Sequence, residues 1–315
     1  MTKVVFILGC TGCGKGAVAR EVARRIAGQI VSVDSMKIYR RMDIGTAKPS
    51  QAHRALVPHH GIDLVEPSES FSVAQFVAEA DRAIERIAAA GGVPVAAGGT
   101  SLYIKALTEG LFEGPSADAG VRERLTERAR REGAAALHAE LAAVDPVAAE
   151  RIHPNDERRI VRALEVFQAT GTPISHLQRQ WDAGARRYEC VMIGLRRDRA
   201  DQARRINLRA KRMMDLGLRE EVSSLLAAPG GLSLQAAQAV GYAELIDHLH
   251  GRCSLEEAFE RIKINTRLLA KKQRTWHRRF EGVQWFDLEA DEPAAETAGR
   301  ILQQAADMLR KEEGR

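Results

Sequence analysis

Cysteine, proline and aromatic residues are scarce in this chain of 315 residues, which has 4 Cys, 10 Pro and 5% aromatic residues. So few cysteines over this length exclude a disulfide-stapled scaffold. No apolar run approaches the ~18 residues of a membrane-spanning helix, and the short run at 4–8 does not resemble a signal peptide. With 45% hydrophobic and 28% charged residues, the composition predicts a globular, cytosolic protein without a membrane segment.

Acidic residues are missing from one basic stretch of the chain and rare in another. Residues 261–279 contain 8 Lys and Arg and no Asp or Glu, and residues 151–212 contain 15 basic against 7 acidic residues. Of the 47 basic residues, 37 are Arg, which suits bidentate phosphate contacts better than Lys does. Charge alone leaves two interpretations open: surfaces that bind a polyanion such as nucleic acid, or solvated helix faces.

Short apolar runs alternate with helical periods in the first third of the chain. The runs predict strands at 4–9, 30–34 and 93–97, and the periods predict helices at 17–27 and after Ser72, which forms a capping box with Gln75. This alternation predicts an α/β fold in which helices flank a parallel sheet.

From about residue 115 to 188 only helical periods occur, and strand-like runs return at 190–195 and 283–288. The order therefore predicts a P-loop-like core of residues 1–115 and 189–315 with an all-helical insertion domain at 116–188.

The loop after the first predicted strand fits the pattern G-x-x-x-x-G-K, in which backbone N–H groups and a lysine bind phosphates. It predicts a diphosphate or nucleotide site formed by Gly9, Cys10, Thr11, Gly12, Cys13, Gly14, Lys15 and Gly16. Gly16 stands where a nucleoside triphosphatase needs Ser or Thr to hold Mg²⁺, which weakens the ATPase interpretation. Cys10 and Cys13 form a lone C-x-x-C without a second ligand pair, so a zinc or redox role is not expected.

Asp34 and Thr100 follow two predicted strands of the parallel sheet. The carboxyl ends of such strands meet at the same edge, so both residues are expected beside the Lys15 loop. Asp34 has three possible roles: a water-mediated Mg²⁺ ligand, the general base of a group-transfer enzyme, or a cap of the next turn.

Several segments together resemble the tRNA dimethylallyltransferase (tRNA isopentenyltransferase) family, over most of the chain. They are G-C-T-G-C-G-K at 9–15, S-V-D-S-M-K-I-Y at 32–39, M-D-I-G-T-A-K-P at 42–49, A-G-G-T-S-L-Y at 97–103, D-P-V-A-A-E-R-I-H-P-N-D at 145–156, R-R-I-V-R-A-L-E-V at 158–166, V-G-Y at 240–242 and T-R-L-L-A-K-K-Q-R-T-W at 266–276. The phosphate loop alone is weak evidence, whereas D-S-x-x-x-Y followed by M-D-I-G-T-A-K-P is highly specific.

The resemblance implies transfer of a dimethylallyl group from dimethylallyl diphosphate to N6 of adenosine 37 in tRNAs that read codons beginning with U. It implies a P-loop that binds diphosphate rather than ATP, a helical insertion that contacts tRNA, and Mg²⁺ as cofactor, whose protein ligands the sequence does not identify. The implied catalytic residues are Asp34 as general base, Thr100, and Arg205, with Arg209 as the alternative diphosphate arginine. The implied tRNA contacts are Asp34, Ser35, Met36, Lys37, Thr100, Arg122, Arg158, Arg159, Ile160, Val161 and Arg162.

Two features depart from the family pattern, which usually has Ser or Thr at the position of Gly16 and commonly Pro at that of Cys10. Two other functions therefore remain as alternatives. A P-loop kinase acting on a small molecule would use ATP on the loop, and a non-catalytic tRNA-binding relative would retain RNA binding alone. A monomer acting on one tRNA is the simplest expectation.

Overall fold

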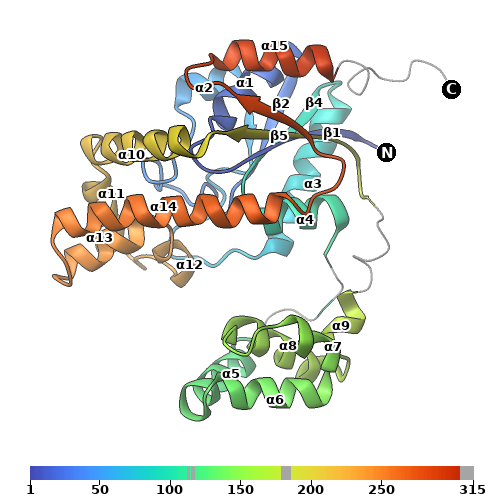
Figure 1. Ribbon diagram of the computed structural model, residues 1–315, viewed down its shortest axis with the longest axis vertical. Coiled ribbons are helices and arrows are strands. Elements are labelled where there is room, and N and C mark those ends of the chain that lie inside the picture. The colour runs from blue at the N-terminus through green and yellow to red at the C-terminus, as the bar shows by residue number, and fades with distance from the viewer. Residues whose placement is uncertain (112–113, 115–117, 179–185, 306–315) are drawn as a thin grey trace. The chain divides into compact units, whose positions relative to one another are not determined.

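The computed structural model describes residues 1–111, 114, 118–178 and 186–305. Its strands are β1 (Lys3–Gly9), β2 (Gly28–Val33), β3 (His59–His60), β4 (Val93–Gly98), β5 (Glu189–Arg197) and β6 (Gln284–Leu288). They form one six-stranded sheet in the order β3-β2-β4-β1-β5-β6, and every neighbouring pair is parallel (Figure 1). The predicted parallel sheet is therefore confirmed, and the two-residue strand β3 is the one that the sequence did not predict.

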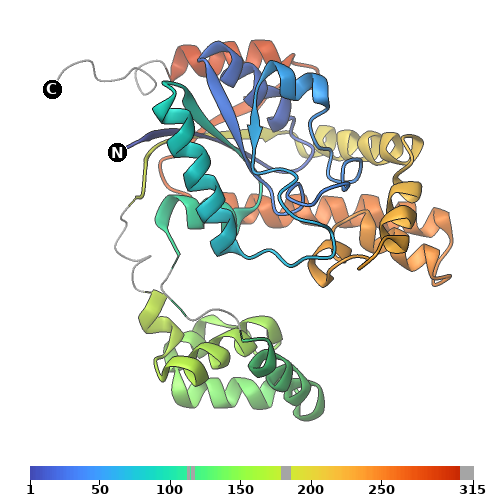
Figure 2. The same ribbon diagram turned by 180° about the vertical axis from the view of Figure 1, so that it is seen from behind.

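Helices cover both faces of this sheet because its central strands are apolar on both sides. On one face, α1 (Lys15–Arg25) and α15 (Ala294–Gln304) pack on Val5, Ile7 and Ile193. On the other face, α3 (Val73–Ala89), α4 (Ser101–Glu109) and α14 (Leu255–His277) pack on the side chains that point the opposite way, among them Phe6 and Leu8 (Figure 1 and Figure 2).

Local capping signals fix several helix starts. The Ser72 side chain accepts the N–H of Gln75, and the Gln75 side chain accepts the N–H of Ser72, so the predicted capping box at the start of α3 is confirmed. Ser254 and Glu257 form the same arrangement at α14, which has 23 residues. The other helices of the core are α2 (Gln51–Leu56), α10 (Arg199–Asp215), α11 (Leu218–Ala227), α12 (Leu234–Ala237) and α13 (Tyr242–Leu249).

The chain divides into two compact units, and unit 2 (Glu109–Arg186) is inserted in unit 1 (Met1–Thr108 and Arg187–Arg315). The expected boundaries were 116 and 188. The described part of unit 2 contains the helices α5 (Ala119–Glu132), α6 (Ala134–Val144), α7 (Pro146–Arg151), α8 (Glu157–Thr170) and α9 (Ile174–Leu177). These helices enclose a core of their own that includes Leu137, Leu141, Ile160 and Leu164.

In unit 1, the N–H of Arg187 donates to the carbonyl oxygen of Thr108 at 2.9 Å, so the two points where the chain leaves and re-enters unit 1 are adjacent. Among the described residues, no helix is both long and apolar enough to cross a membrane.

Candidate active site

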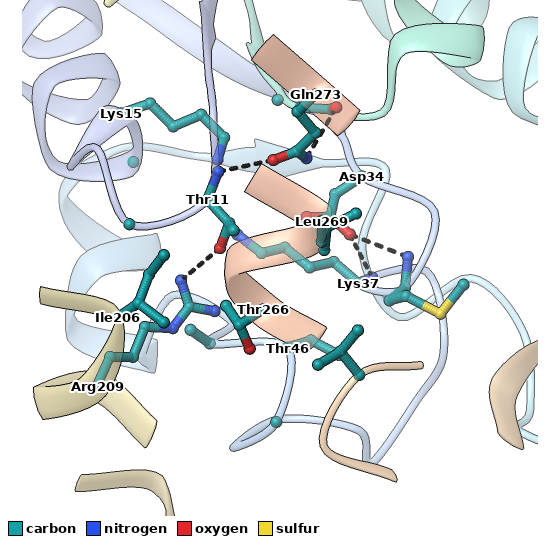
Figure 3. A pocket seen from close by; sticks show the side chains of 18 of the residues that line it. Thr11, Lys15, Asp34, Lys37, Thr46, Ile206, Arg209, Thr266, Leu269 and Gln273 are labelled. Atoms are coloured by element: carbon teal, nitrogen blue, oxygen red, sulfur yellow. Dashed lines mark hydrogen bonds between the residues drawn. The ribbon is translucent and has the colours of Figure 1, made fainter. Parts of the chain in front are cut away.

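A cavity of about 1040 Å³ lies in unit 1 at the carboxyl edge of the sheet. The register explains its position, because Leu8 of β1 and Val33 of β2 both pair with Gly98 of β4, so the three strands end at one level. The segments that follow these strands form one side of the cavity, and helices α10 and α14 form the other (Figure 3). Open α/β sheets bind their ligands at this edge.

The phosphate loop turns tightly between β1 and α1. Gly12 and Gly14 have φ of 81° and 96°, which side chains with a Cβ rarely adopt, and Lys15 begins α1. Of the predicted loop residues, five line the cavity: Thr11, Gly12, Gly14, Lys15 and Gly16.

The other predicted loop residues, Gly9, Cys10 and Cys13, lie beneath the loop and do not line the cavity. Gly9 ends β1. Cys10 packs with Ile206 and Ala270, and Cys13 joins the core under α1. Burial raises the pKa of the Cys10 thiol, with the neighbouring Cys13 adding to the effect. These two side chains therefore pack the loop against the hydrophobic core and do not face a ligand in the cavity.

Asp34 follows β2 directly, and its turn holds the carboxylate in place. Oδ1 accepts the N–H groups of Met36 and Lys37 at 3.0 and 3.3 Å, whereas Oδ2 has no hydrogen-bond partner among the described residues. Figure 3 shows the carboxylate inside the cavity, facing α14. One oxygen is thus fixed and the other is available to a substrate.

Thr100 connects the end of β4 to the same turn. Its hydroxyl oxygen accepts the N–H of Ser35 at 3.1 Å. The approach of β4 to β2 requires glycine, because a Cβ on Gly98 would lie 1.9 Å from the carbonyl oxygen of Val33. The structure therefore brings Asp34, Thr100 and the phosphate loop together at one cavity, as the sequence predicted.

Two arginines of α10, Arg205 and Arg209, line the cavity and occupy different surroundings. Arg209 donates to the hydroxyl oxygen of Thr11 at 3.4 Å. Burial lowers its pKa, and the charge of Asp34 opposes this shift. Arg205 donates to the carbonyl oxygen of Ala290 at 3.1 Å. Arg209 is the one already in contact with the phosphate loop, and the assignment of the diphosphate arginine to Arg205 stays a prediction.

Gln273 of α14 hydrogen-bonds both to the phosphate loop and to the end of β4, a role the sequence did not predict. Its Oε1 accepts the N–H of Thr11 at 2.8 Å, and its Nε2 donates to the carbonyl oxygen of Gly99 at 2.9 Å (Figure 3). The residue lies within the segment 266–276 that carries the resemblance. Neither its amide side chain nor its position in that segment predicts these two hydrogen bonds. A single side chain thereby sets the distance between the phosphate loop and the end of β4.

The lining of the cavity has a strongly positive region and an apolar region. Among its described residues are eight cations against the carboxylates of Asp34 and Asp291, namely Lys15, Arg20, Lys37, Arg204, Arg205, Arg209, Arg212 and Lys272. Helices α10, α11 and α14 add apolar side chains, including Ile206, Met213, Leu218, Ile262 and Leu269. The arrangement suits a ligand with a polyanionic group and an apolar part.

A model of the IPP transferase family matches residues 37–280. The chain belongs to the IPP transferase family. Among curated members, the tRNA dimethylallyltransferase of Geobacter sulfurreducens is 48% identical to it over 290 residues, which is 92% of this chain and 93% of that protein. The tRNA dimethylallyltransferase of Geobacillus thermodenitrificans is 44% identical, and the match covers 98% of both chains.

Solved structures of the IPP transferase family have the same fold. The tRNA isopentenylpyrophosphate transferase of Bacillus halodurans aligns with a TM-score of 0.70 at 39% identity, covering 98% of this chain and 99% of that one. The transferase from Staphylococcus epidermidis gives 0.71 at 32% identity, with 98% and 100% covered. A eukaryotic dimethylallyltransferase gives 0.79 at 23% identity, covering 100% of this chain and 81% of that one, which shows the likeness of fold alone.

Gly16 does not supply the hydroxyl that usually holds Mg²⁺ in a phosphate loop. A Cβ placed on Gly16 would lie 3.8 Å from Nη1 of Arg20, so a guanidinium lies beside this position. Among the described residues, no group of three or more His, Cys, Asp or Glu side chains could hold a metal ion. The described phosphate loop therefore lacks the hydroxyl ligand that usually holds Mg²⁺.

The predicted tRNA contacts of unit 2 lie on or near α8, and two of them need correction. Ile160 and Val161 are 0% and 4% exposed and pack in the core of unit 2, so their side chains do not face solvent. The helical period explains this, because an amphipathic helix must turn its apolar residues inward.

The arginines around Ile160 and Val161 differ in their pairing. Arg122 and Arg162 both contact the buried carboxylate of Glu165, at 2.8 and 2.9 Å. Arg159 pairs with Asp156 at 3.3 Å. Arg158 is exposed and has no hydrogen bond or ion pair with a described residue. Of these predicted contacts, it is therefore the one whose charge is available to an anionic ligand.

Proposed function

We propose that this chain transfers the dimethylallyl group of dimethylallyl diphosphate to N6 of adenosine 37 in tRNAs that read codons beginning with U. The observation that carries the proposal is one cavity in which a phosphate loop, an apolar wall and a single well-oriented carboxylate meet. Support also comes from relatives named tRNA dimethylallyltransferase, which match more than nine-tenths of the chain.

The cationic part of the cavity binds the diphosphate. Backbone N–H groups of the loop, the N-terminus of α1 and Lys15 surround the phosphates, with Arg205 and Arg209 facing them from α10. As the bond between the allylic carbon and the diphosphate oxygen breaks, negative charge grows on that oxygen. Fixed positive groups stabilise the growing charge more than the ground state, which lowers the barrier.

Asp34 accepts the proton that leaves the adenine amine. The exocyclic nitrogen forms its bond to the allylic carbon, diphosphate departs with the electron pair of the broken C–O bond, and Oδ2 of Asp34 takes the N6 proton. A positioned carboxylate contributes about 10²- to 10⁴-fold to such a step. Thr100 keeps the turn that carries Asp34 aligned through Ser35.

The base reaches this cavity only when it leaves its stack, which an anticodon loop allows at lower cost than a duplex. We therefore propose the anticodon stem-loop as the part of tRNA that binds. The segment Asp34–Lys37 and the exposed arginines of unit 2, Arg158 above all, stay predicted contacts. The chain is proposed to act as a monomer in the cytoplasm, and Mg²⁺ as a cofactor of the alkylation stays a prediction.

The experiment incubates the protein with unmodified tRNA, Mg²⁺ and labelled dimethylallyl diphosphate, with a parallel reaction that contains ATP, and analyses the nucleosides by mass. Label on N6 of adenosine without any requirement for ATP is the expected result. Phosphoryl transfer from ATP would favour a kinase, and tight tRNA binding without alkylation would favour a non-catalytic relative. The comparisons support neither alternative.

A further inference from the structure

We infer that Arg20 and Lys37, here called the Arg20–Lys37 pair, bind the diphosphate where a metal held by the phosphate loop would lie, so that diphosphate binding does not require a divalent metal. The inference rests on the proposed function, since it concerns the leaving group of that reaction. It assigns the neutralisation of the diphosphate to side chains of this chain.

The first observation concerns the residue after the phosphate-loop lysine. Gly16 offers no hydroxyl, and a Cβ at this position would lie 3.8 Å from Nη1 of Arg20. Arg20 lies four residues further along α1, and residues at this spacing are neighbours on one helix face. Both residues line the cavity. The guanidinium of Arg20 thus lies beside the position where a Ser or Thr hydroxyl would bind the metal in other phosphate loops.

The second observation concerns the pairing of Arg20. It forms no hydrogen bond or ion pair with a described residue, although it is partly buried. On the same helix, Arg24 pairs with Glu21 at 3.0 Å, and Arg25 donates to the carbonyl oxygen of Ala295 at 2.7 Å. Burial lowers the pKa of Arg20, with Glu21 opposing. An unpaired cation in such a place is stabilised when an anion enters the cavity.

The third observation is the direction of Lys37. Figure 3 shows its side chain extending from the Asp34 turn toward the Thr11 side of the cavity. Its ammonium group interacts electrostatically with Lys15, Arg209 and Arg20, and these like charges add to the burial that lowers its pKa, while Asp34 opposes them. Cations from the turn after β2, from α1 and from α10 therefore converge on one volume, and a multiply charged anion would relieve their mutual repulsion.

The chemistry of the two side chains matches this ligand. A guanidinium donates two parallel hydrogen bonds to a phosphate group, and an ammonium adds a compact charge. When the allylic C–O bond breaks, the electron pair stays on the diphosphate oxygen, and the pair stabilises it without a co-reactant. Neither residue exchanges a proton in this step.

The test measures the affinity of the full-length protein for inorganic diphosphate by calorimetry, without tRNA, in excess EDTA and in Mg²⁺. Wild-type protein is expected to bind in EDTA, with a dissociation constant within about threefold of that in Mg²⁺. Arg20→Ala and Lys37→Met are each expected to weaken binding in EDTA by about tenfold or more, as loss of a charge-assisted contact does. Arg20→Lys should recover part of the loss.

Arg24→Ala is the matched control, because it removes the same charge from the same helix at an exposed residue that does not line the cavity. The double variant Gly16→Ser with Arg20→Ala exchanges the guanidinium for a hydroxyl, and its diphosphate binding is expected to depend on Mg²⁺. Thermal unfolding of each variant checks that the fold is intact.

Loss of wild-type binding in EDTA, or unchanged binding in a folded Arg20→Ala variant, would overturn the inference. These outcomes are independent of the alkylation assay. If diphosphate binds as inferred but no dimethylallyl group reaches tRNA, the proposed function fails and the inference about the pair stands. If alkylation occurs but diphosphate binding requires metal, the inference fails and the function stands.

Discussion

The Asp34 carboxylate combines a restrained oxygen with a free one. Two backbone N–H groups hold Oδ1, so the orientation of the group is set before any substrate arrives. Such preorganisation means that the base needs no rearrangement during the proton transfer. Oδ2 is the atom to which the catalytic role of Asp34 is assigned.

Replacing Asp34 by Asn keeps an oxygen for the two N–H groups but removes the base. The single-turnover rate of alkylation is expected to fall by about 10²- to 10⁴-fold, with the dissociation constant for tRNA changed little. Asp291→Asn is the control, because Asp291 is the other carboxylate of the cavity and is 87% exposed. An Asp34→Asn variant with wild-type turnover would remove Asp34 from the mechanism.

Lys37 gives diphosphate binding a defined dependence on pH. Burial lowers its pKa from 10.5 to about 8; Lys15, Arg209 and Arg20 add to this, and Asp34 opposes it. The free protein therefore loses this positive charge as the pH rises through about 8. Unfolded chains keep the proton up to about pH 10.5, so the same shift makes the folded protein relatively more stable as the pH rises between these values.

The affinity of wild-type protein for diphosphate, divided by that of Lys37→Arg, is expected to fall between about pH 7 and 9.5, since Arg stays charged. Taking the ratio cancels the titration of diphosphate itself. Calorimetry at several pH values provides the measurement, and a ratio that stays constant would show that Lys37 does not contact the ligand.

Helix α3 illustrates which features a sequence makes visible. Its start was predicted from Ser72 and Gln75, and five of the six strands were predicted from apolar runs. Strand β3 was not, because it consists of two histidines that pair with β2 only after the chain has folded back. A hydrophobic pattern predicts which side chains are buried. A strand that pairs only through its backbone, without buried apolar side chains, gives no such pattern.

The candidate site divides in the same way. Asp34, Thr100 and the phosphate loop follow strands, so parallel topology alone brings them together. The positions of three other side chains, those of Gln273, Arg20 and Ile160, depend on how their helices are rotated about their axes. This rotation decides whether a polar side chain points into the cavity and whether a residue within a basic segment is buried. The family resemblance implied that Ile160 and Val161 contact tRNA, but a motif does not show this rotation, which buries their side chains.

Gln273 provides a test of α14 as the element that holds the two loops together. Gln273→Met removes both hydrogen bonds at similar volume, and kcat is expected to fall about tenfold, or ~1.4 kcal/mol, with the melting temperature nearly unchanged. Gln273→Glu keeps the acceptor for Thr11 but loses the donor to Gly99, and it adds a negative charge near the phosphates, so its KM for dimethylallyl diphosphate should rise as well.

Thr275→Ala, an exposed residue of α14 that lies outside this cavity, is the control for both Gln273 variants. Wild-type kcat in the folded Gln273→Met variant would mean that the loops keep their spacing without this bridge.

The chain as a whole consists of unit 1, which contains the cavity, and of the inserted helical unit 2, which has a hydrophobic core of its own. The change from alternating strands and helices to helices alone revealed the insertion, but its limits at Glu109 and Arg186 follow from packing rather than from composition.

Glu165 holds Arg122 and Arg162 within unit 2. Burial alone would raise the pKa of Glu165, but the hydrogen bonds from these two arginines lower it.

Arg158 is the arginine of α8 expected to act on RNA. Arg158→Ala should weaken tRNA binding and reduce the slope of log K against log salt by about one, because one phosphate contact is lost. Arg130→Ala is the control, since Arg130 is exposed in the same unit and pairs with Glu127. Fluorescence anisotropy at several salt concentrations measures the slope, and equal slopes for both variants and wild type would exclude the Arg158 contact.

The hydrogen bond between Arg187 and Thr108 has a consequence for how such a protein can change over time. Because the inserted unit starts and ends at neighbouring residues, a gene can lengthen, shorten or exchange it while the sheet keeps every one of its pairings. Variation in the inserted unit can then accumulate in one stretch of codons without disturbing the sequence on either side of it. For protein engineering, the same junction is a natural point at which to graft a different helical module.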